Sequence, residues 1–211
     1  MRLLMFDSLK ASAMMVALVL ETVGCLTSAP PQPKNWIISA PRKPSAEITV
    51  TKASRLGSLS VAAPYDKPAL AVKRADGSIA FDAYNVFATS PSALLRAPLS
   101  ALLENDGRFG SILSAVSAAR ADSTLEAVVT DLSLDCREEG HHTARVALSL
   151  AVIENREVKM FLDGEGSADA ATGDYSAAFS EAFAKAVAAA LALAPQPLEK
   201  SGEVHQSSPR P

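Results

Sequence analysis

The side chains with most potential for chemistry are the adjacent histidines His141 and His142, near Glu138, Glu139 and Cys136. Imidazole, carboxylate and thiolate groups are the usual ligands of zinc. Adjacent residues on a strand point to opposite faces, however, so two histidines at i and i+1 chelate one ion poorly. We therefore expect this polar run to be a solvated hairpin turn, and we expect no metal and no cofactor.

A second candidate is Asp163-Gly-Glu-Gly-Ser167, which offers carboxylates for Ca²⁺ but lacks the spacing of a 12-residue loop. We expect it to be a strand end and a turn. Cys136 ends an alternating apolar stretch and is expected to be a small buried hydrophobe. The chain contains neither a Gly-x-Ser-x-Gly elbow nor a Gly-x-x-x-x-Gly-Lys-Ser/Thr phosphate loop. The sequence therefore predicts a protein that is not an enzyme and not an ATPase.

Cys25 follows a hydrophobic N-terminal segment. The chain begins Met1-Arg2, carries an apolar run from Ala11 to Leu20, and then reaches Gly24 and Cys25. The run is shorter than the roughly 20 apolar residues of a membrane-spanning helix. A basic start, an apolar stretch and a small residue are typical of a secretory signal.

A small residue directly before a cysteine resembles the lipobox of bacterial lipoproteins, in which that cysteine receives acyl chains and becomes the new N-terminus. The resemblance implies a signal peptide over 1–24, lipidation of Cys25 and membrane attachment through its acyl chains. Thr22 stands where a lipobox usually has a large aliphatic residue. The alternative is an ordinary signal peptide cleaved elsewhere, for example near Ala29.

Composition bounds the remaining chain. The full chain has 211 residues, a formal net charge of −3, 48% hydrophobic residues and 5% aromatic residues. No basic patch is evident, so nucleic-acid binding has no support. We expect residues 25–45 to form a lipidated tether with a first short strand, residues 46–194 to form one folded domain, and residues 195–211 to form a disordered tail.

Apolar spacing predicts the elements of that domain. Alternation predicts strands at 58–61 and 70–72, a hairpin turn at Asp76-Gly77, and further strand character at 79–81. Ser90-Pro91 predicts a helix start, Pro98 a kink or a broken first turn, and 105–107 its end.

The second half alternates over 124–136, 144–152 and 158–162, with a switch of parity near Thr130-Asp131 that indicates burial on both faces or a bulge. These strands form an antiparallel meander. Asp174 is expected to cap a last helix whose apolar residues recur every four positions, namely Tyr175, Phe179, Phe183, Val187 and Leu191. The expected fold class is α+β, an antiparallel sheet with two main helices packed on one face in a single domain.

This pattern resembles the ABC-type transport auxiliary lipoproteins, partners of MCE-type phospholipid transport systems, from about Trp36 to Leu193. The stretches that carry the resemblance are Asn35-Trp-Ile-Ile38, Leu59-Ser-Val-Ala-Ala-Pro-Tyr65, Leu70-Ala-Val-Lys-Arg-Ala-Asp-Gly-Ser-Ile79 and the aromatic helix entry Tyr84-Asn-Val-Phe-Ala-Thr-Ser-Pro91. Phe87 replaces the tryptophan usual at that entry, which removes an indole N–H.

The resemblance implies a non-catalytic, lipid-anchored auxiliary subunit that moves phospholipids or other apolar solutes across the envelope. Its partners would be an MCE-domain protein with an ABC permease and an ATPase. It would lie on the periplasmic face of the outer membrane. In such lipoproteins, Asp directly after the lipidated cysteine is associated with inner-membrane retention. This chain has Leu26 at that position, which agrees with an outer-membrane location. The alternative function is envelope assembly, as a cell-wall synthase activator or an outer-membrane biogenesis factor.

Four aromatic residues are candidates for partner contacts: Tyr65, Tyr84, Phe87 and Trp36. Core filling is the competing interpretation, and it is favoured for Phe87 and Trp36. Tyr65 lies between Pro64 and Pro68, a loop context in which an exposed aromatic side chain is a plausible partner anchor. We therefore expect Tyr65 and its proline-flanked loop to contact a partner.

Overall fold

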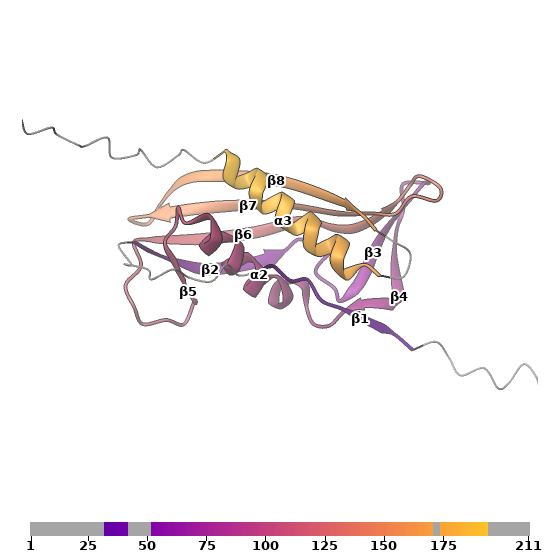
Figure 1. Cartoon of the computed structure of the whole chain (residues 1–211), viewed down its shortest axis with the longest axis horizontal. Coiled ribbons are helices and arrows are strands. Elements are labelled where there is room, and N and C mark those ends of the chain that lie inside the picture. The colour runs from indigo at the N-terminus through magenta and orange to yellow at the C-terminus, as the bar shows by residue number, and fades with distance from the viewer. Residues whose placement is uncertain (1–31, 42–51, 171–173, 194–211) are drawn as a thin grey trace, which may run out of the picture. The chain divides into compact units, whose positions relative to one another are not determined.

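An eight-stranded mixed sheet and two helices form an α+β single domain in the computed structural model, which describes residues 32–41, 52–170 and 174–193 (Figure 1). The strands are β1 (Lys34–Trp36), β2 (Ala53–Val61), β3 (Ala69–Arg74), β4 (Ile79–Phe87), β5 (Ser111–Leu113), β6 (Ser123–Cys136), β7 (Thr143–Glu154) and β8 (Glu157–Asp169). The helices are α2 (Pro91–Asp106) and α3 (Ser176–Ala192).

The meander of β6, β7 and β8 is confirmed, since both of its strand pairs are antiparallel. Asn155 and Arg156 make the tight turn between β7 and β8 with positive φ angles of 53° and 67°, which suits the right-handed twist of a hairpin. The register of β6 against β7 shifts between Val129 and Asp131. The parity switch seen in the sequence is therefore a β-bulge.

The expectation of an antiparallel sheet is wrong. β2 and β3 follow each other along one edge of β6, and both run parallel to it. Of the seven strand pairs within the described residues, four are parallel. The chain returns to β6 through a connection that contains α2, and such crossovers bring strands back in parallel. Alternating apolar residues indicate a strand but carry no information on this direction.

α3 packs closely on the sheet because β8 carries glycines beneath it. Its expected apolar stripe is buried, with Phe179 and Phe183 at most 1% exposed. The helix begins at Ser176 with Tyr175 at the N-cap position, one residue later than the expected Asp174 cap. Residues 163–167 were expected to be a strand end and a turn, which is wrong: β8 continues to Asp169, since Gly164 and Gly166 allow the helix to approach.

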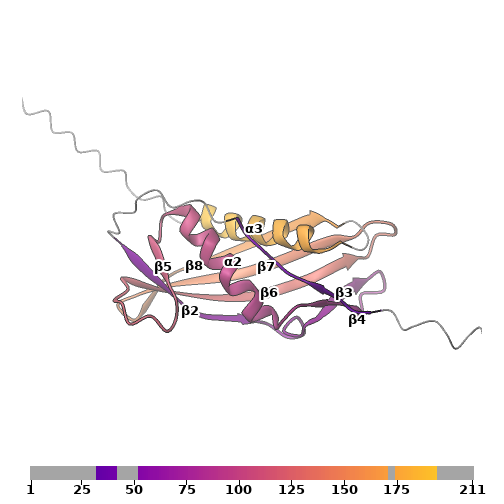
Figure 2. The same cartoon turned by 60° about the horizontal axis from the view of Figure 1, so that its bottom comes forward.

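α2 lies on the same face as α3, against β2 and β5 (Figure 2). It begins at Pro91 as expected, runs through the buried Pro98 and ends at Gly107, whose φ of 82° is the left-handed conformation common after helices. The sheet face opposite the helices, called here the open face, carries exposed alternate residues such as Glu126 and Val128 of β6. No helix within the described residues is long and apolar enough to cross a membrane.

The segment that follows β1 crosses the helical layer between α2 and α3 (Figure 2). The Ser176 hydroxyl donates a hydrogen bond to the Ile37 carbonyl (2.6 Å), and the Asn105 amide donates to the Pro41 carbonyl (2.7 Å). Ile38 is 4% exposed and fills the space between the helices. The N-terminal segment of the domain thereby connects the β1–β4 edge of the sheet with both helices.

Candidate functional site

The structure places the four candidate aromatic residues in two regions. Phe87 is buried, 3% exposed, and its ring meets that of Phe179 edge-on with centroids 5.5 Å apart. Trp36 is half-buried against Tyr175, and its indole N–H donates to the Asn85 side chain at 3.1 Å. Phe87 therefore belongs to the core and, in this structure, offers no surface to a partner.

Tyr84 lies on β4 and is half exposed, at 51%. The stretch from Tyr84 to Phe87 forms the end of β4, paired in parallel with β1, rather than the beginning of the helix. The Asp82 carboxylate accepts hydrogen bonds from the backbone N–H groups of Tyr84 (2.8 Å) and Asn85 (3.1 Å). These bonds fix the backbone from which the Tyr84 side chain projects.

Tyr65 lies in the loop between β2 and β3, as expected, after a cis peptide bond between Ala63 and Pro64. Its N–H donates to the Ala62 carbonyl at 2.9 Å. The side chain is half-buried, and the Lys73 ammonium lies 5.7 Å from the centre of its ring. The loop is held at both ends because β2 and β3 both pair with β6.

A second aromatic–lysine pair lies beside Tyr65 on the open face. Phe81 is 42% exposed, and the Lys67 ammonium stands 5.2 Å from its ring centre. Ile79, 38% exposed, is registered with Lys73 across the β3–β4 hairpin, which places it two residues from Phe81 on the same face. We call Tyr65, Lys67, Lys73, Ile79 and Phe81 the aromatic–lysine patch.

The charge of Lys73 is balanced by a carboxylate on the neighbouring strand β6. Its ammonium forms an ion pair with Asp131, which also accepts a hydrogen bond from the buried Ser133 hydroxyl at 2.6 Å. The bulge in β6 positions Asp131 for both contacts. The ion pair holds Lys73 beside Tyr65, so the ring of Tyr65 is supported before any partner binds.

Farther along β6, Asp135 binds two arginines. Arg137 contacts it through a 2.6 Å ion pair and Arg145 through a 2.8 Å ion pair. The hydrogen bond from Arg137 is the main cause that lowers the pKa of Asp135 to about 2, against desolvation, which acts in the other direction. This cluster keeps a carboxylate ionised over the physiological range and pairs it with both arginines.

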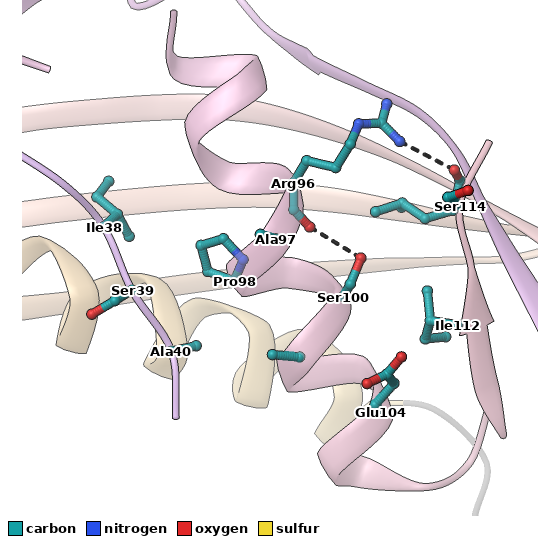
Figure 3. Close-up of a pocket in the computed structure, with 12 residues that line it drawn as sticks. Ile38, Ser39, Ala40, Arg96, Ala97, Pro98, Ser100, Glu104, Ile112 and Ser114 are labelled. Carbon is teal, nitrogen blue, oxygen red and sulfur yellow. Dashed lines mark hydrogen bonds between the residues drawn. The ribbon is translucent and has the colours of Figure 1, made fainter. Parts of the chain in front are cut away.

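An open groove of about 510 Å³ runs along α2 on the other face of the sheet (Figure 3). Ile38, Leu56 and Ile112 are among its apolar residues, and Arg96 and Glu104 are its charged ones. The Arg96 guanidinium donates to the carbonyls of Leu56 (3.2 Å) and Gly57 (3.1 Å). The groove is therefore an apolar depression whose cation is bound to the backbone, an arrangement suited to contact rather than catalysis.

The residues that could bind a metal are dispersed. His141 and His142 lie in the turn between β6 and β7, as expected. Over residues 32–41, 52–170 and 174–193, no group of three histidine, cysteine, aspartate or glutamate side chains is placed to hold an ion. Cys136 is a free, half-buried cysteine, and burial is the main cause that raises the pKa of its thiol. Cys25 lies outside the described residues.

Comparison with known proteins shows a likeness of fold. No protein-family model matches the chain, and no curated protein matches its sequence. The fold is similar to that of protein XCC0632 from Xanthomonas campestris, of family DUF330, with a TM-score of 0.53 and 18% identity over 74% of this chain and 86% of that one. DUF330 is the ABC-type transport auxiliary lipoprotein family. At this identity the likeness establishes the fold alone.

Two further structures are more distant. An uncharacterized protein has a TM-score of 0.48 and 14% identity over 74% of this chain and 94% of that one. The PelC dodecamer from Paraburkholderia phytofirmans has a TM-score of 0.33 and 15% identity over 68% of this chain and 94% of that one. Scores this low carry no argument about this chain.

Of the aromatic–lysine patch, sequence reasoning named Tyr65 as a candidate and did not name Phe81 or Lys67. Alternation of Ile79 and Phe81 beyond the Asp76-Gly77 turn indicated a strand. It did not show which face the helices cover, and so it did not show that Phe81 is exposed. The proximity of Lys67 to Phe81 arises only when β3 and β4 pair, since the two residues are 14 positions apart.

Proposed function

We propose that this protein is a non-catalytic, lipid-anchored auxiliary subunit of an ABC/MCE transport system that moves phospholipids or other apolar solutes across a bacterial envelope. The observation that carries the proposal is the shared fold with XCC0632 of family DUF330 over 74% of the chain. The Gly24-Cys25 pair supplies the anchor, as acyl chains on Cys25. Multiple acyl chains hold a protein stably, because each buried CH₂ contributes about 0.8 kcal/mol.

The aromatic–lysine patch is the proposed contact with the MCE-domain partner. Aromatic side chains dominate the energetics of protein interfaces. Tyr65 is supported by Lys73, and Phe81 projects from a paired strand, so binding would cost little conformational entropy. Asp131 balances Lys73, which leaves the patch largely apolar with Lys67 at its margin. A patch of this kind suits an apolar partner surface with an acidic rim.

Purification from native membranes tests the proposal. The full chain with a C-terminal tag is extracted in mild detergent, and the captured proteins are identified by mass spectrometry. The proposal expects an MCE-domain protein together with an ABC permease and an ATPase. Recovery of cell-wall synthases or outer-membrane assembly factors in their place would support the alternative envelope-assembly function and overturn the transporter role.

Matched variants locate the contact. Tyr65→Ala and Phe81→Ser are expected to lose the MCE-domain protein while the folded protein accumulates normally. Phe161→Ser removes an equally large aromatic side chain, 68% exposed on β8, and is expected to retain it. Phe81→Ser guards against the possibility that truncation of the half-buried Tyr65 disturbs the loop. Unchanged capture by both patch variants would remove the patch from the proposal.

A further inference from the structure

We propose that the edge formed by β1 and the end of β4 lies against the lipid surface of the membrane that holds the acylated Cys25, with Tyr84 and Ile37 in the headgroup region. The occupant of this edge is thus a lipid bilayer rather than a protein. The inference rests on the anchor of the proposed function but concerns a surface that the anchor alone does not specify.

The length of the connecting chain restricts where this edge can be. Lys34, the first residue of β1, lies nine positions after Cys25. A chain of that length spans at most about 30–32 Å, whatever its conformation. β1 is one edge of the sheet, and β8, which pairs only with β7, forms another edge on the far side of β6 (Figure 1). Acylation of Cys25 therefore keeps the β1–β4 edge within about 32 Å of the bilayer, whereas β8 can lie farther away by the width of the sheet.

The edge exposes apolar side chains toward one side. Ile37 is 55% exposed and Tyr84 is 51% exposed. Trp36 contacts Tyr175 at the N-cap of α3 and Ile38 is buried, whereas Ile37 between them is exposed and projects away from the core. Tyr84 precedes Asn85, whose side chain accepts the Trp36 indole N–H, and alternation directs Tyr84 to the same side as Ile37.

The charged residues of this edge do not compete with its apolar side chains. Lys34 lies on the Trp36 side of β1, with its ammonium 5.9 Å from the centre of the Trp36 ring. The nearby Asp82 carboxylate is occupied by the backbone of Tyr84 and by the Asn85 amide, at 2.7 Å. Tyrosine is enriched at membrane–water interfaces. The edge thus presents an aromatic ring and an aliphatic side chain on the side away from the helices.

Tryptophan placement on the full, exported chain tests the contact. The protein is reconstituted in vesicles of phosphatidylethanolamine and phosphatidylglycerol, with or without brominated acyl chains. The variants Tyr84→Trp and Ile37→Trp each add one emitter to the single native tryptophan, Trp36. The added emission is expected to be blue-shifted and largely lost in brominated vesicles. Phe161→Trp, on β8, is the matched control and is expected to keep its added emission.

The inference would be overturned if bromination left the emission of the variants at positions 84, 37 and 161 unchanged. It would also be overturned if bromination quenched all three variants equally. Acyl labelling of the same preparations, with Cys25→Ala as reference, reports on the anchor separately. Labelled protein without quenching at position 84 would overturn the edge contact and leave the proposed anchor standing. Quenching at position 84 in unlabelled protein would support the edge contact and refute the anchor.

Discussion

Gly164 of β8 lies so close to α3 that a Cβ atom at this position would stand 2.0 Å from the carbonyl oxygen of Ala186. Gly166 repeats the relationship one helical turn earlier, where a Cβ would stand 2.1 Å from the carbonyl oxygen of Ala182. Both alanines are fully buried. The contact between this helix and this strand is therefore backbone against backbone, and neither partner can yield by moving a side chain.

Gly164→Ala is expected to destabilise the fold by about 3 kcal/mol or more, at or above the upper end of overpacking costs, because the whole helix must shift. Chemical denaturation measures the free energy of unfolding. Glu165→Ala, on the opposite face of the same strand, is the control and should change it by no more than about 0.5 kcal/mol. A Gly164→Ala protein as stable as wild type would contradict the close packing of α3 on β8.

A buried pair of hydroxyls joins β2 to β6. Ser54 and Ser123 are at most 3% exposed, and their oxygens lie 2.7 Å apart. The Ser54 hydroxyl donates to the Phe109 carbonyl at 2.8 Å, so the Ser123 hydroxyl must donate to Ser54. Ser54→Ala leaves two buried groups unpaired and is expected to cost about 1–3 kcal/mol, whereas Ser123→Ala is expected to cost less.

The double variant Ser54→Ala/Ser123→Ala is expected to lose less free energy of unfolding than the two single variants lose together. The reason is that Ser123→Ala also removes one of the two groups that Ser54→Ala leaves unpaired. A double-mutant cycle of unfolding free energies measures this difference. Strict additivity would show that the two hydroxyls do not interact. Ser58→Ala, exposed on β2, provides the baseline for a serine that lies outside the network.

Asp135 contributes to the pH dependence of stability. The pKa of its carboxyl is lowered from 3.8 to about 2, chiefly by the hydrogen bond from Arg137. A lowered pKa in the folded state contributes stability above the unfolded value, and this contribution is lost as the pH falls through the folded value. Because Arg137 and Arg145 are about half exposed, solvent screening reduces the contribution to about 1–2 kcal/mol.

Asp135→Asn is therefore expected to be less stable than wild type near neutral pH, and the difference should shrink between about pH 4 and pH 2. Unfolding free energies measured across that range, together with an NMR titration of the carboxyl, provide the check. A difference that persists unchanged to pH 2 would mean that Asp135 acts by packing rather than by its charge.

Thiol chemistry tests the anchor independently of any partner. The chain has two cysteines. Burial and the Asp135 carboxylate raise the pKa of the Cys136 thiol, so little of its thiolate is present at neutral pH. We expect slow reaction of Cys136 with a disulfide reagent in the folded protein and fast reaction after unfolding. If Cys25 is acylated, the unfolded, exported protein should yield only one reactive thiol.

Two reactive thiols after unfolding would show that the Cys25 sulfur is unmodified and would refute the lipid anchor. Cys136→Ala should then leave one thiol, and an acylated protein with the same substitution should leave none. Rapid reaction of Cys136 in the folded protein would contradict its half-buried position at the end of β6.

The sequence by itself determined the local elements. Strict four-residue spacing of apolar residues predicted α3, Pro91 and Gly107 bounded α2, and a change of parity located the bulge in β6. These features depend on interactions between residues close in the chain, which sequence spacing records. The Tyr65 loop was predictable for the same reason, because Pro64 and Pro68 break both strands beside it.

Only the tertiary structure decided how distant elements pair. The parallel pairing of β2 and β3 with β6 depends on how the chain returns through α2, which alternation does not encode. Residues 163–167 contain glycines because α3 packs closely on them, and not because the chain turns there. Gly164 and Gly166 lie within β8, where a side chain would collide with the helix backbone. The open face likewise emerges only once both helices cover the other side, and that coverage separates the exposed Phe81 from the buried Phe87.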